Sequence, residues 1–351
     1  MIYHLFELLS DYDIPGQRLM GYLSFRAMLA FVTAMLISFF AGRRIIRWLQ
    51  KKQIGETIRD LGLEGQMQKK GTPTMGGVII LLAILVSALL FCDLTNIYTQ
   101  LLIFTTVWCG GIGFADDYIK VFKHNKEGMS ERGKLILQVV LGCIVGLTVC
   151  FNNDIVIREK VRIEADADST HYLPQGSENV DVDSETIVSQ SGWKMENIIK
   201  STKTTLPFIK AHEFDYKWLS PFSGKWGWYC KWAIYVIMIV IVITACSNGT
   251  NLTDGMDGLA AGTSAIVGIV LGILAWLSGN LINSNYLDIM YIPGTGEIAV
   301  FMSIFVGALL GFLWYNSYPA QVFMGDTGSL AIGGIIGVSA ILLRKELMLP
   351  V

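Results

Sequence analysis

Two adjacent carboxylates and a lysine stand at the end of a long apolar run. Asp116, Asp117 and Lys120 follow residues 101–115, which are almost wholly apolar. An ionised side chain at the centre of a bilayer costs on the order of 2.5–3.5 kcal/mol by insertion scales, so this pair belongs at a membrane surface. Paired carboxylates there can hold Mg²⁺ through their oxygens, and one of them can act as a base. On these residues alone, the pair can equally be interpreted as the end of a helix that lies in water and has no catalytic role.

A second candidate is the stretch K-K-G-T-P-T-M-G-G, which runs from Lys69 to Gly77 at the start of another apolar run. Backbone N–H groups, hydroxyls such as that of Thr74 and two lysines can bind a phosphate there, helped by the dipole of the helix that follows. The spacing is not that of a Walker A loop. The alternative is a helix opened by Pro73, with lysines that only face the cytoplasm.

The third stretch is N-L-T-D-G-M-D-G-L, from Asn251 to Leu259. Its polar members, Asn251, Asp254 and Asp257, are spaced by three, so in a helical turn they fall near one face and can converge on one ligand. Glycines beside them leave room for it. A turn rich in Asn and Asp that caps a helix is the alternative.

The fourth stretch is W-Y-N-S-Y-P-A-Q-V-F-M-G-D-T-G-S, which ends at Ser329. It offers an amide at Asn316, an aromatic ring at Phe323 and a carboxylate between glycines at Asp326, a set that could stack a base and hold a metal. A capped helix start at Asp326 is the alternative.

Together with Lys134, at the start of another apolar run, the four stretches indicate a metal-assisted reaction on phosphate groups at a lipid surface.

The elements that must position these residues are transmembrane helices. With 52% hydrophobic and 16% charged residues, the chain is too apolar for a soluble domain. The apolar runs are about 20 residues long, as a helical span requires, and lack the alternation of barrel strands. We therefore predict an all-α polytopic membrane protein with about eight spans, over residues 22–42, 75–93, 97–115, 134–152, 228–247, 257–278, 297–317 and 329–347. Arg26 is expected to snorkel to the interface.

Lysine and arginine residues predict the orientation, because they favour short cytoplasmic loops. They are frequent in the connections at about 43–74 and 116–133 and absent from 93–96. The N-terminus is then extracytoplasmic, and all four candidate stretches lie on the cytoplasmic face. The long connection at about 153–227 becomes an extracytoplasmic insertion in which no catalytic arrangement is found. The net charge of -2 argues against a nucleic-acid partner, and the six cysteines are interpreted as unpaired packing residues.

The four stretches, in this order, resemble those of the polyprenyl-phosphate sugar-1-phosphate transferases, and most closely the phospho-N-acetylmuramoyl-pentapeptide transferases. The strings that carry the resemblance are G-T-P-T-M-G-G, F-x-D-D-Y-x-K, N-L-T-D-G-x-D-G-L and F-M-G-D-T-G-S. The resemblance implies one membrane transferase domain over residues 1–351, in the bacterial inner membrane with its active site on the cytoplasmic face. It implies transfer of phospho-MurNAc-pentapeptide from UDP-MurNAc-pentapeptide to undecaprenyl phosphate, which gives lipid I and UMP with Mg²⁺. The resemblance is also compatible with a homodimer.

The resemblance also implies roles for the acidic residues and their neighbours. Asp326 and Asn251 are the expected Mg²⁺ contacts, with Asp117 as a further one and Asp254 close by. Asp116 is expected to take the proton of the lipid phosphate. Catalysis would therefore depend on the three aspartates 116, 117 and 326.

The substrate-binding residues that the resemblance implies fall into two groups. Phe323 would stack on uracil, and Lys69, Asp257 and Asn316 would form hydrogen bonds with the nucleoside. The remaining residues would face the diphosphate or the lipid phosphate, or shape the pocket: Lys120, Lys134 and Thr74, beside Asp254.

Two features depart from the family pattern. The family ordinarily has ten spans and a histidine-rich cytoplasmic stretch before the last, whereas this sequence ends at Val351, soon after the eighth run. We therefore expect the chain to be a fragment that lacks the last two helices. The insertion at about 153–227 is the second departure.

Two other functions compete with this interpretation. Transfer of GlcNAc-1-phosphate to undecaprenyl phosphate is the alternative within the same superfamily. An ion-coupled transporter would place its acids near the bilayer midplane on broken helices, whereas here they gather at one surface.

Overall fold

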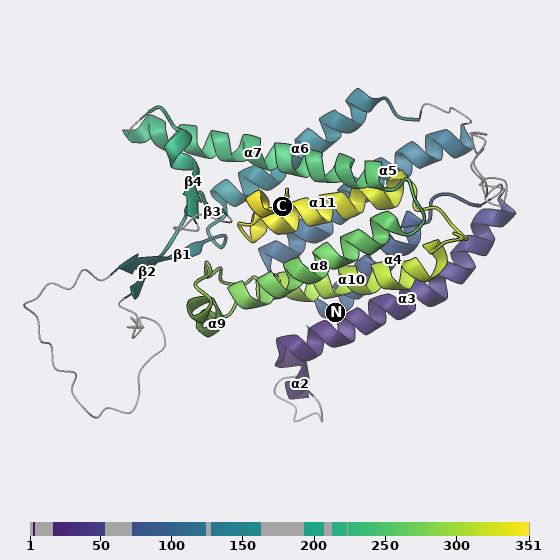
Figure 1. Ribbon diagram of the computed structural model, residues 1–351, viewed down its shortest axis with the longest axis horizontal. Helices are drawn as coiled ribbons and strands as arrows, with labels where there is room; N and C mark the ends of the chain where they lie inside the picture. The colour runs from purple at the N-terminus through teal and green to yellow at the C-terminus, as the bar shows by residue number, and fades with distance from the viewer. Residues whose placement is uncertain are drawn as a thin grey trace, which may run out of the picture.

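The computed structural model describes Tyr3 and residues 17–52, 72–123, 128–162, 193–206, 213–222 and 224–350. Helices dominate these residues and lie side by side along the long axis of the molecule (Figure 1). In chain order they are α2 (Gln17–Gly21), α3 (Leu23–Lys51), α4 (Gly77–Phe91), α5 (Ile97–Phe122), α6 (Glu131–Phe151), α7 (Gly224–Thr253), α8 (Leu259–Ser278), α9 (Leu281–Tyr286), α10 (Gly296–Asn316) and α11 (Asp326–Leu342).

The helical bundle is that of a multi-pass membrane protein, and one helix lies over each predicted span. Within the described residues, six helices are long and apolar enough to cross a membrane, namely α3, α5, α6, α7, α8 and α10. The apolar helices α4 and α11 are shorter, with 15 and 17 residues. The predicted ends of several spans were wrong: α5 continues to Phe122 and α7 to Thr253, because a helix does not have to stop where its apolar run stops.

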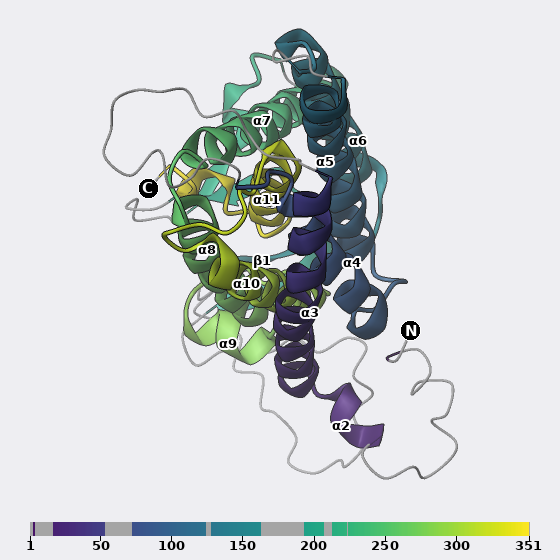
Figure 2. The same cartoon turned by 90° about the vertical axis from the view of Figure 1, so that its right-hand side faces the viewer.

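Helix α11 forms the centre of the bundle. Figure 2 shows it nearly end-on, with α5, α7, α8 and α10 around it. Every residue from Thr327 to Leu342 is buried. Small residues permit this close packing: a Cβ added at Gly333 would overlap the carbonyl oxygen of Cys246, and one at Gly334 would lie 2.6 Å from Cys109 Sγ. Helices in lipid associate through such close backbone contacts.

The segments before α4 and before α11 pair with each other at one end of the bundle. Phe323 donates its N–H to the Pro73 carbonyl at 2.9 Å, and the Phe323 carbonyl accepts the N–H of Gly76 at 2.8 Å. A third bond joins Gly77 N to the Met324 carbonyl at 2.8 Å. These bonds fix the segment that leads into α11.

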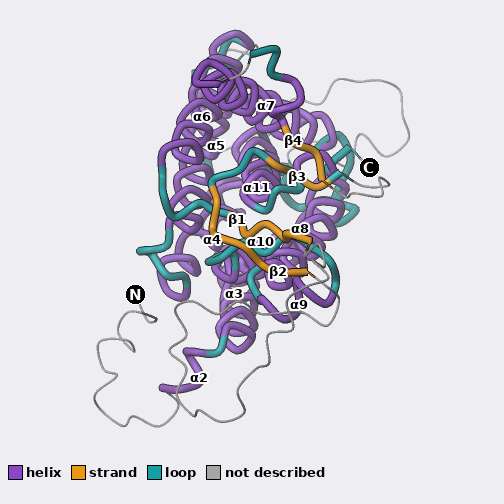
Figure 3. Tube along the Cα trace, turned by 90° about the vertical axis from the view of Figure 1, so that its left-hand side faces the viewer, coloured by secondary structure: helices purple, strands orange, loops and turns teal. Residues whose placement is uncertain are grey.

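The opposite end carries the described part of the insertion, which adds strands to a fold that was predicted to be all-α. The strands β1 (Ile157–Arg162) and β2 (Trp193–Ile199) form one antiparallel pair, and β3 (Lys203–Thr205) and β4 (Glu213–Asp215) form another (Figure 3). The 3₁₀ turns η2 (Tyr216–Leu219) and η3 (Glu346–Met348) lie beside them. Strand β3 is anchored to the residues after α11, because Thr205 N donates to the Arg344 carbonyl at 2.9 Å.

A buried ion pair joins α3 to α10. Arg26 is 5% exposed and Glu297 is 9% exposed, and their charged groups are in contact. Glu297 Oε2 also accepts the N–H of Asp93 at 2.9 Å. The prediction that Arg26 snorkels to the interface was therefore wrong, because a carboxylate 271 residues further along the chain pairs with it inside the bundle.

The close approach of α5 and α11 yields the first testable prediction. A Cβ at Gly113 would overlap the carbonyl of Asp326, whereas one at Gly111 would meet no atom within 4 Å. We expect Gly113→Ala to cost about 1–3 kcal/mol through overpacking and to lower the midpoint of thermal unfolding in detergent. Gly111→Ala is the matched control and should leave the midpoint unchanged or raise it, because alanine favours a helix more than glycine does. Equal effects of the two substitutions would contradict this packing.

Candidate active site

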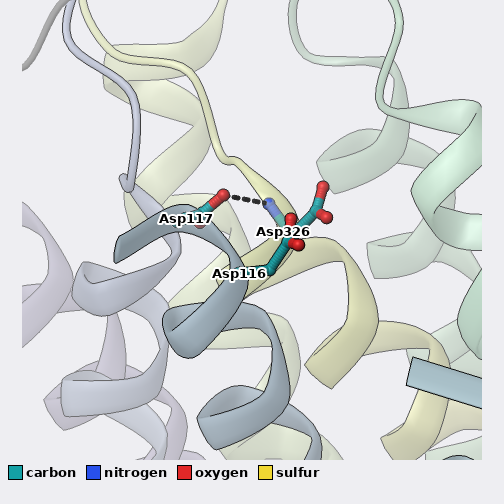
Figure 4. Close-up of side chains that lie close together, drawn as sticks. All are labelled: Asp116, Asp117 and Asp326. Carbon is teal, nitrogen blue, oxygen red and sulfur yellow. Dashed lines mark hydrogen bonds between the residues drawn. The ribbon is translucent and has the colours of Figure 1, made fainter. Parts of the chain in front are cut away.

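Three aspartates that are far apart in the sequence meet at the end of the bundle opposite the strands. Asp116 and Asp117 belong to the last turns of α5, and Asp326 is the first residue of α11. Each offers a carboxylate oxygen, and these three oxygens lie within 4.8 Å of one another (Figure 4). We call this group the aspartate cluster. The resemblance grouped these three aspartates as the catalytic residues, and the structure brings them together.

Asp116 and Asp326 share two lysines. Asp116 is fully buried, and its Oδ2 lies 2.6 Å from Lys120 Nζ and 2.9 Å from Lys134 Nζ. The same two ammonium groups lie 3.2 and 2.7 Å from Asp326 Oδ2. Asp116 Oδ1 accepts the N–H of Met129 at 2.7 Å. Two positive charges thus balance two negative ones, which offsets the cost of burying carboxylates.

Asp117 has a different environment, because it caps the N-terminus of α11. Its Oδ1 accepts the N–H of Asp326 at 3.2 Å, drawn as the dashed line in Figure 4. Its Oδ2 accepts the N–H of Thr327 at 2.9 Å and the Thr327 hydroxyl at 2.6 Å. The residue before the helix, Gly325, provides no side-chain cap. A carboxylate from α5 therefore satisfies the free N–H groups and faces the positive end of the helix dipole.

Asn251 and Asp257 have partners in different parts of the site. Asn251 lies in the last turn of α7, and its Oδ1 is 2.8 Å from the hydroxyl of Ser329 on α11. This contact places it one helical turn from Asp326. Helix α7 ends before Asp254, and Asp257 Oδ2 accepts the N–H of Ala320 at 3.2 Å. The expected single helical face of Asn251, Asp254 and Asp257 is interrupted by this helix end.

Two of the residues expected to bind the nucleoside, Asn316 and Phe323, lie at or between α10 and α11. Asn316 is 2% exposed, its Oδ1 accepts the N–H of Gly258 at 3.1 Å, and its Nδ2 donates to the Val322 carbonyl at 2.9 Å. Phe323 is half-buried. The hydroxyl of Thr74 borders Gly325, where it would lie 3.1 Å from an added Cβ. Lys69 lies outside the described residues.

The aspartate cluster has the donor set that Mg²⁺ prefers. Its ligands are carboxylate oxygens, which suit this hard cation. Asp116 Oδ2 is already paired with the ammonium groups of Lys120 and Lys134. The fit to a metal therefore rests on the three carboxylate oxygens that lie within 4.8 Å of one another.

Two residues of the site, Thr327 and Ser329, were missed in the sequence. Both follow Asp326 within one turn, and each binds a residue that was predicted to contact the metal. The signal was present in D-T-G-S, because Ser and Thr at a helix start commonly form such polar contacts.

The fold and the site define a membrane-embedded transferase. Residues 194–344 match the model of glycosyl transferase family 4. Residues 69–81 match signature 1 of the phospho-N-acetylmuramoyl-pentapeptide-transferases.

Proteins with similar sequences identify the family of transferases to which the chain belongs. The chain is 52% identical over 351 residues to the phospho-N-acetylmuramoyl-pentapeptide-transferase of Parabacteroides distasonis, covering all of this chain and 79% of the relative. It is 51% identical to the enzyme of that name from Azobacteroides pseudotrichonymphae, over 100% of this chain and 79% of the relative. For that from Flavobacterium psychrophilum the identity is 52%, over 100% of this chain and 82% of the relative. The chain belongs to the phospho-N-acetylmuramoyl-pentapeptide-transferase family.

The cap on α11 yields the second prediction. Thr327→Val removes the hydroxyl that donates to Asp117 and keeps the size of the side chain. We expect it to destabilise the protein by about 1–3 kcal/mol, because a buried carboxylate oxygen loses a donor. The thermal midpoint should fall, and amide hydrogens in the first turn of α11 should exchange faster. Thr327→Ser keeps the hydroxyl and should remain close to the parent protein. A valine variant as stable and as protected as the serine variant would contradict the cap.

Proposed function

We propose that this protein transfers phospho-MurNAc-pentapeptide from UDP-MurNAc-pentapeptide to undecaprenyl phosphate in peptidoglycan biosynthesis. The products are lipid I and UMP. The observation that carries the proposal is the aspartate cluster with Lys120 and Lys134, in a member of this transferase family. The site faces the cytoplasm of the bacterial inner membrane. In support, the predicted cytoplasmic connections, rich in lysine and arginine, join helices at the cluster's end of the bundle.

The reaction exchanges one phosphorus–oxygen bond for another. An oxygen of the lipid phosphate becomes bonded to the sugar-linked phosphorus of the donor, and the bond from that phosphorus to the UMP oxygen breaks. Asp116 takes the proton of the lipid phosphate, and its contacts with Lys120 and Lys134 keep it ionised and oriented. When substrate binds, these two ammonium groups can turn from the carboxylates to phosphate oxygens, since they already bridge Asp116 and Asp326.

Mg²⁺ bound by Asp326, Asn251 and Asp117 would supply charge neutralisation at the departing UMP. The position of Asp326 is set by the cap that Asp117 forms on α11. Asp117 Oδ2 already accepts two hydrogen bonds, which leaves Oδ1 as the oxygen more open to a metal. Asp254 follows α7 and completes the acidic surroundings.

The nucleoside end of the donor binds near the paired segments in front of α11. Phe323 stacks on the uracil, and Lys69, Asp257 and Asn316 provide hydrogen bonds. The backbone bonds of Phe323 to Pro73 and Gly76 hold the aromatic residue at a fixed place, which supports a stacking role. Thr74 borders the same region and shapes the pocket.

A direct assay tests the proposal and yields the third prediction. Membranes that contain this chain should release UMP from UDP-MurNAc-pentapeptide only with undecaprenyl phosphate and Mg²⁺. Asp326→Asn should lower the rate by about 100-fold or more, because the site loses a negative ligand where charge develops. The matched control is Asp288→Asn, since Asp288 follows α9, at the other end of the bundle.

Two results would contradict the proposal. Release from UDP-GlcNAc but not from UDP-MurNAc-pentapeptide would identify the GlcNAc-1-phosphate transferase instead. Equal rates for Asp326→Asn and Asp288→Asn would show that the aspartate cluster takes no part in the reaction.

A further inference from the structure

Ser329 makes two contacts that one hydroxyl hydrogen cannot both satisfy fully. The side chain is fully buried, one turn after Asp326 on α11. Its Oγ lies 3.1 Å from the Gly325 carbonyl oxygen and 2.8 Å from Asn251 Oδ1. Both of these atoms accept hydrogen bonds, and a serine hydroxyl carries only one hydrogen. The hydrogen is either shared between the two acceptors in a weaker three-centre bond or serves one of them fully, in which case the other contact uses a lone pair of the serine.

The bond to Gly325 is the one that the helix favours. Serine and threonine within a helix commonly donate to the carbonyl four residues earlier. Thr105, Thr263 and Ser303 do so in this bundle, at 2.7, 2.8 and 2.8 Å. If Ser329 follows the same pattern, it presents lone pairs to Asn251. The amide atom of Asn251 that faces it must then be the nitrogen, which carries hydrogens.

The number of hydrogens on the serine hydroxyl determines which atom of the Asn251 amide remains available to another ligand. The oxygen and nitrogen of an asparagine side chain are nearly the same size, so hydrogen-bond partners decide its orientation. With Nδ2 donating to Ser329, Oδ1 is turned away from the serine and is left as an acceptor for another ligand. Only the amide oxygen can bind Mg²⁺, because the amide nitrogen has no free lone pair.

We propose that Ser329 is a positioning residue that accepts a hydrogen bond from Asn251 Nδ2 and so presents Asn251 Oδ1 to the metal. The inference rests on the proposed function, in which Asn251 contacts Mg²⁺. The opposite arrangement, with Ser329 donating to Oδ1, makes the serine a competitor of the metal. The two arrangements therefore predict opposite effects when the hydroxyl is removed.

Binding of Mn²⁺ alone to the purified full chain, followed by electron paramagnetic resonance, distinguishes them and is the fourth prediction. Ser329→Ala should weaken Mn²⁺ binding about 10-fold, as substitutions of residues that orient a metal ligand typically do. Ser329→Thr keeps a hydroxyl and should bind close to the parent protein. Ser303→Ala is the matched control, because it removes the same kind of helix hydroxyl on α10. Thermal midpoints identify any variant that does not fold.

A double substitution keeps the test valid if Ser329→Ala is generally disruptive. In an Asn251→Asp background both side-chain oxygens are equivalent ligands, so Ser329→Ala should have little further effect. An equal loss in both backgrounds would overturn the inference. Mn²⁺ binding that is unchanged or tighter in Ser329→Ala would also overturn it, while leaving the proposed function intact. Absence of Mn²⁺ binding by the parent protein, or binding that persists in Asp326→Asn, would overturn the metal site itself and the inference with it.

Discussion

The capping of α11 by Asp117 is the interaction on which the rest of the site depends. One carboxylate on α5 accepts hydrogen bonds from the first two N–H groups and the Thr327 hydroxyl of α11. It thereby fixes the start of a helix whose first residue is Asp326 and whose remaining residues are all buried. The backbone contact between Gly113 and Asp326 has the same effect, because it permits α5 to approach closely enough for the cap to form. Position, rather than charge alone, is what Asp117 provides.

The electrostatics of the site follow from this geometry. The cap holds the partly buried Asp326 next to the fully buried Asp116, and two such carboxylates side by side would repel each other strongly. Lys120 and Lys134, from α5 and α6, lie between them. In the free protein the two ammonium groups balance the carboxylates of Asp116 and Asp326. A bound metal would pair with the carboxylates, and a bound diphosphate would pair with the ammonium groups. All these groups lie at one end of the bundle, where keeping a side chain charged costs less than at the bilayer centre.

Much of the bundle was predictable from the sequence, because the apolar runs correspond to helices. The ends of the helices were not predictable, because hydropathy detects the residues that lie in lipid and not the point where a helix stops. The last turns of α5 and α7, which carry Asp117 and Asn251, lie beyond the predicted spans. Arg26 was misinterpreted because its partner, Glu297, is remote in the sequence. The motifs indicated Asp116, Asp117 and Asp326, yet the distinct role of Asp117 depends on a contact across 209 residues that no local pattern encodes.

The most direct test of this account is an anomalous-scattering map from crystals of the protein grown with Mn²⁺. We predict a single strong peak at the aspartate cluster, within ligand distance of Asp326, Asp117 and Asn251, with the N–H of Thr327 still bonded to Asp117. A peak elsewhere on the molecule, or an α11 whose first turn has left Asp117, would contradict the account.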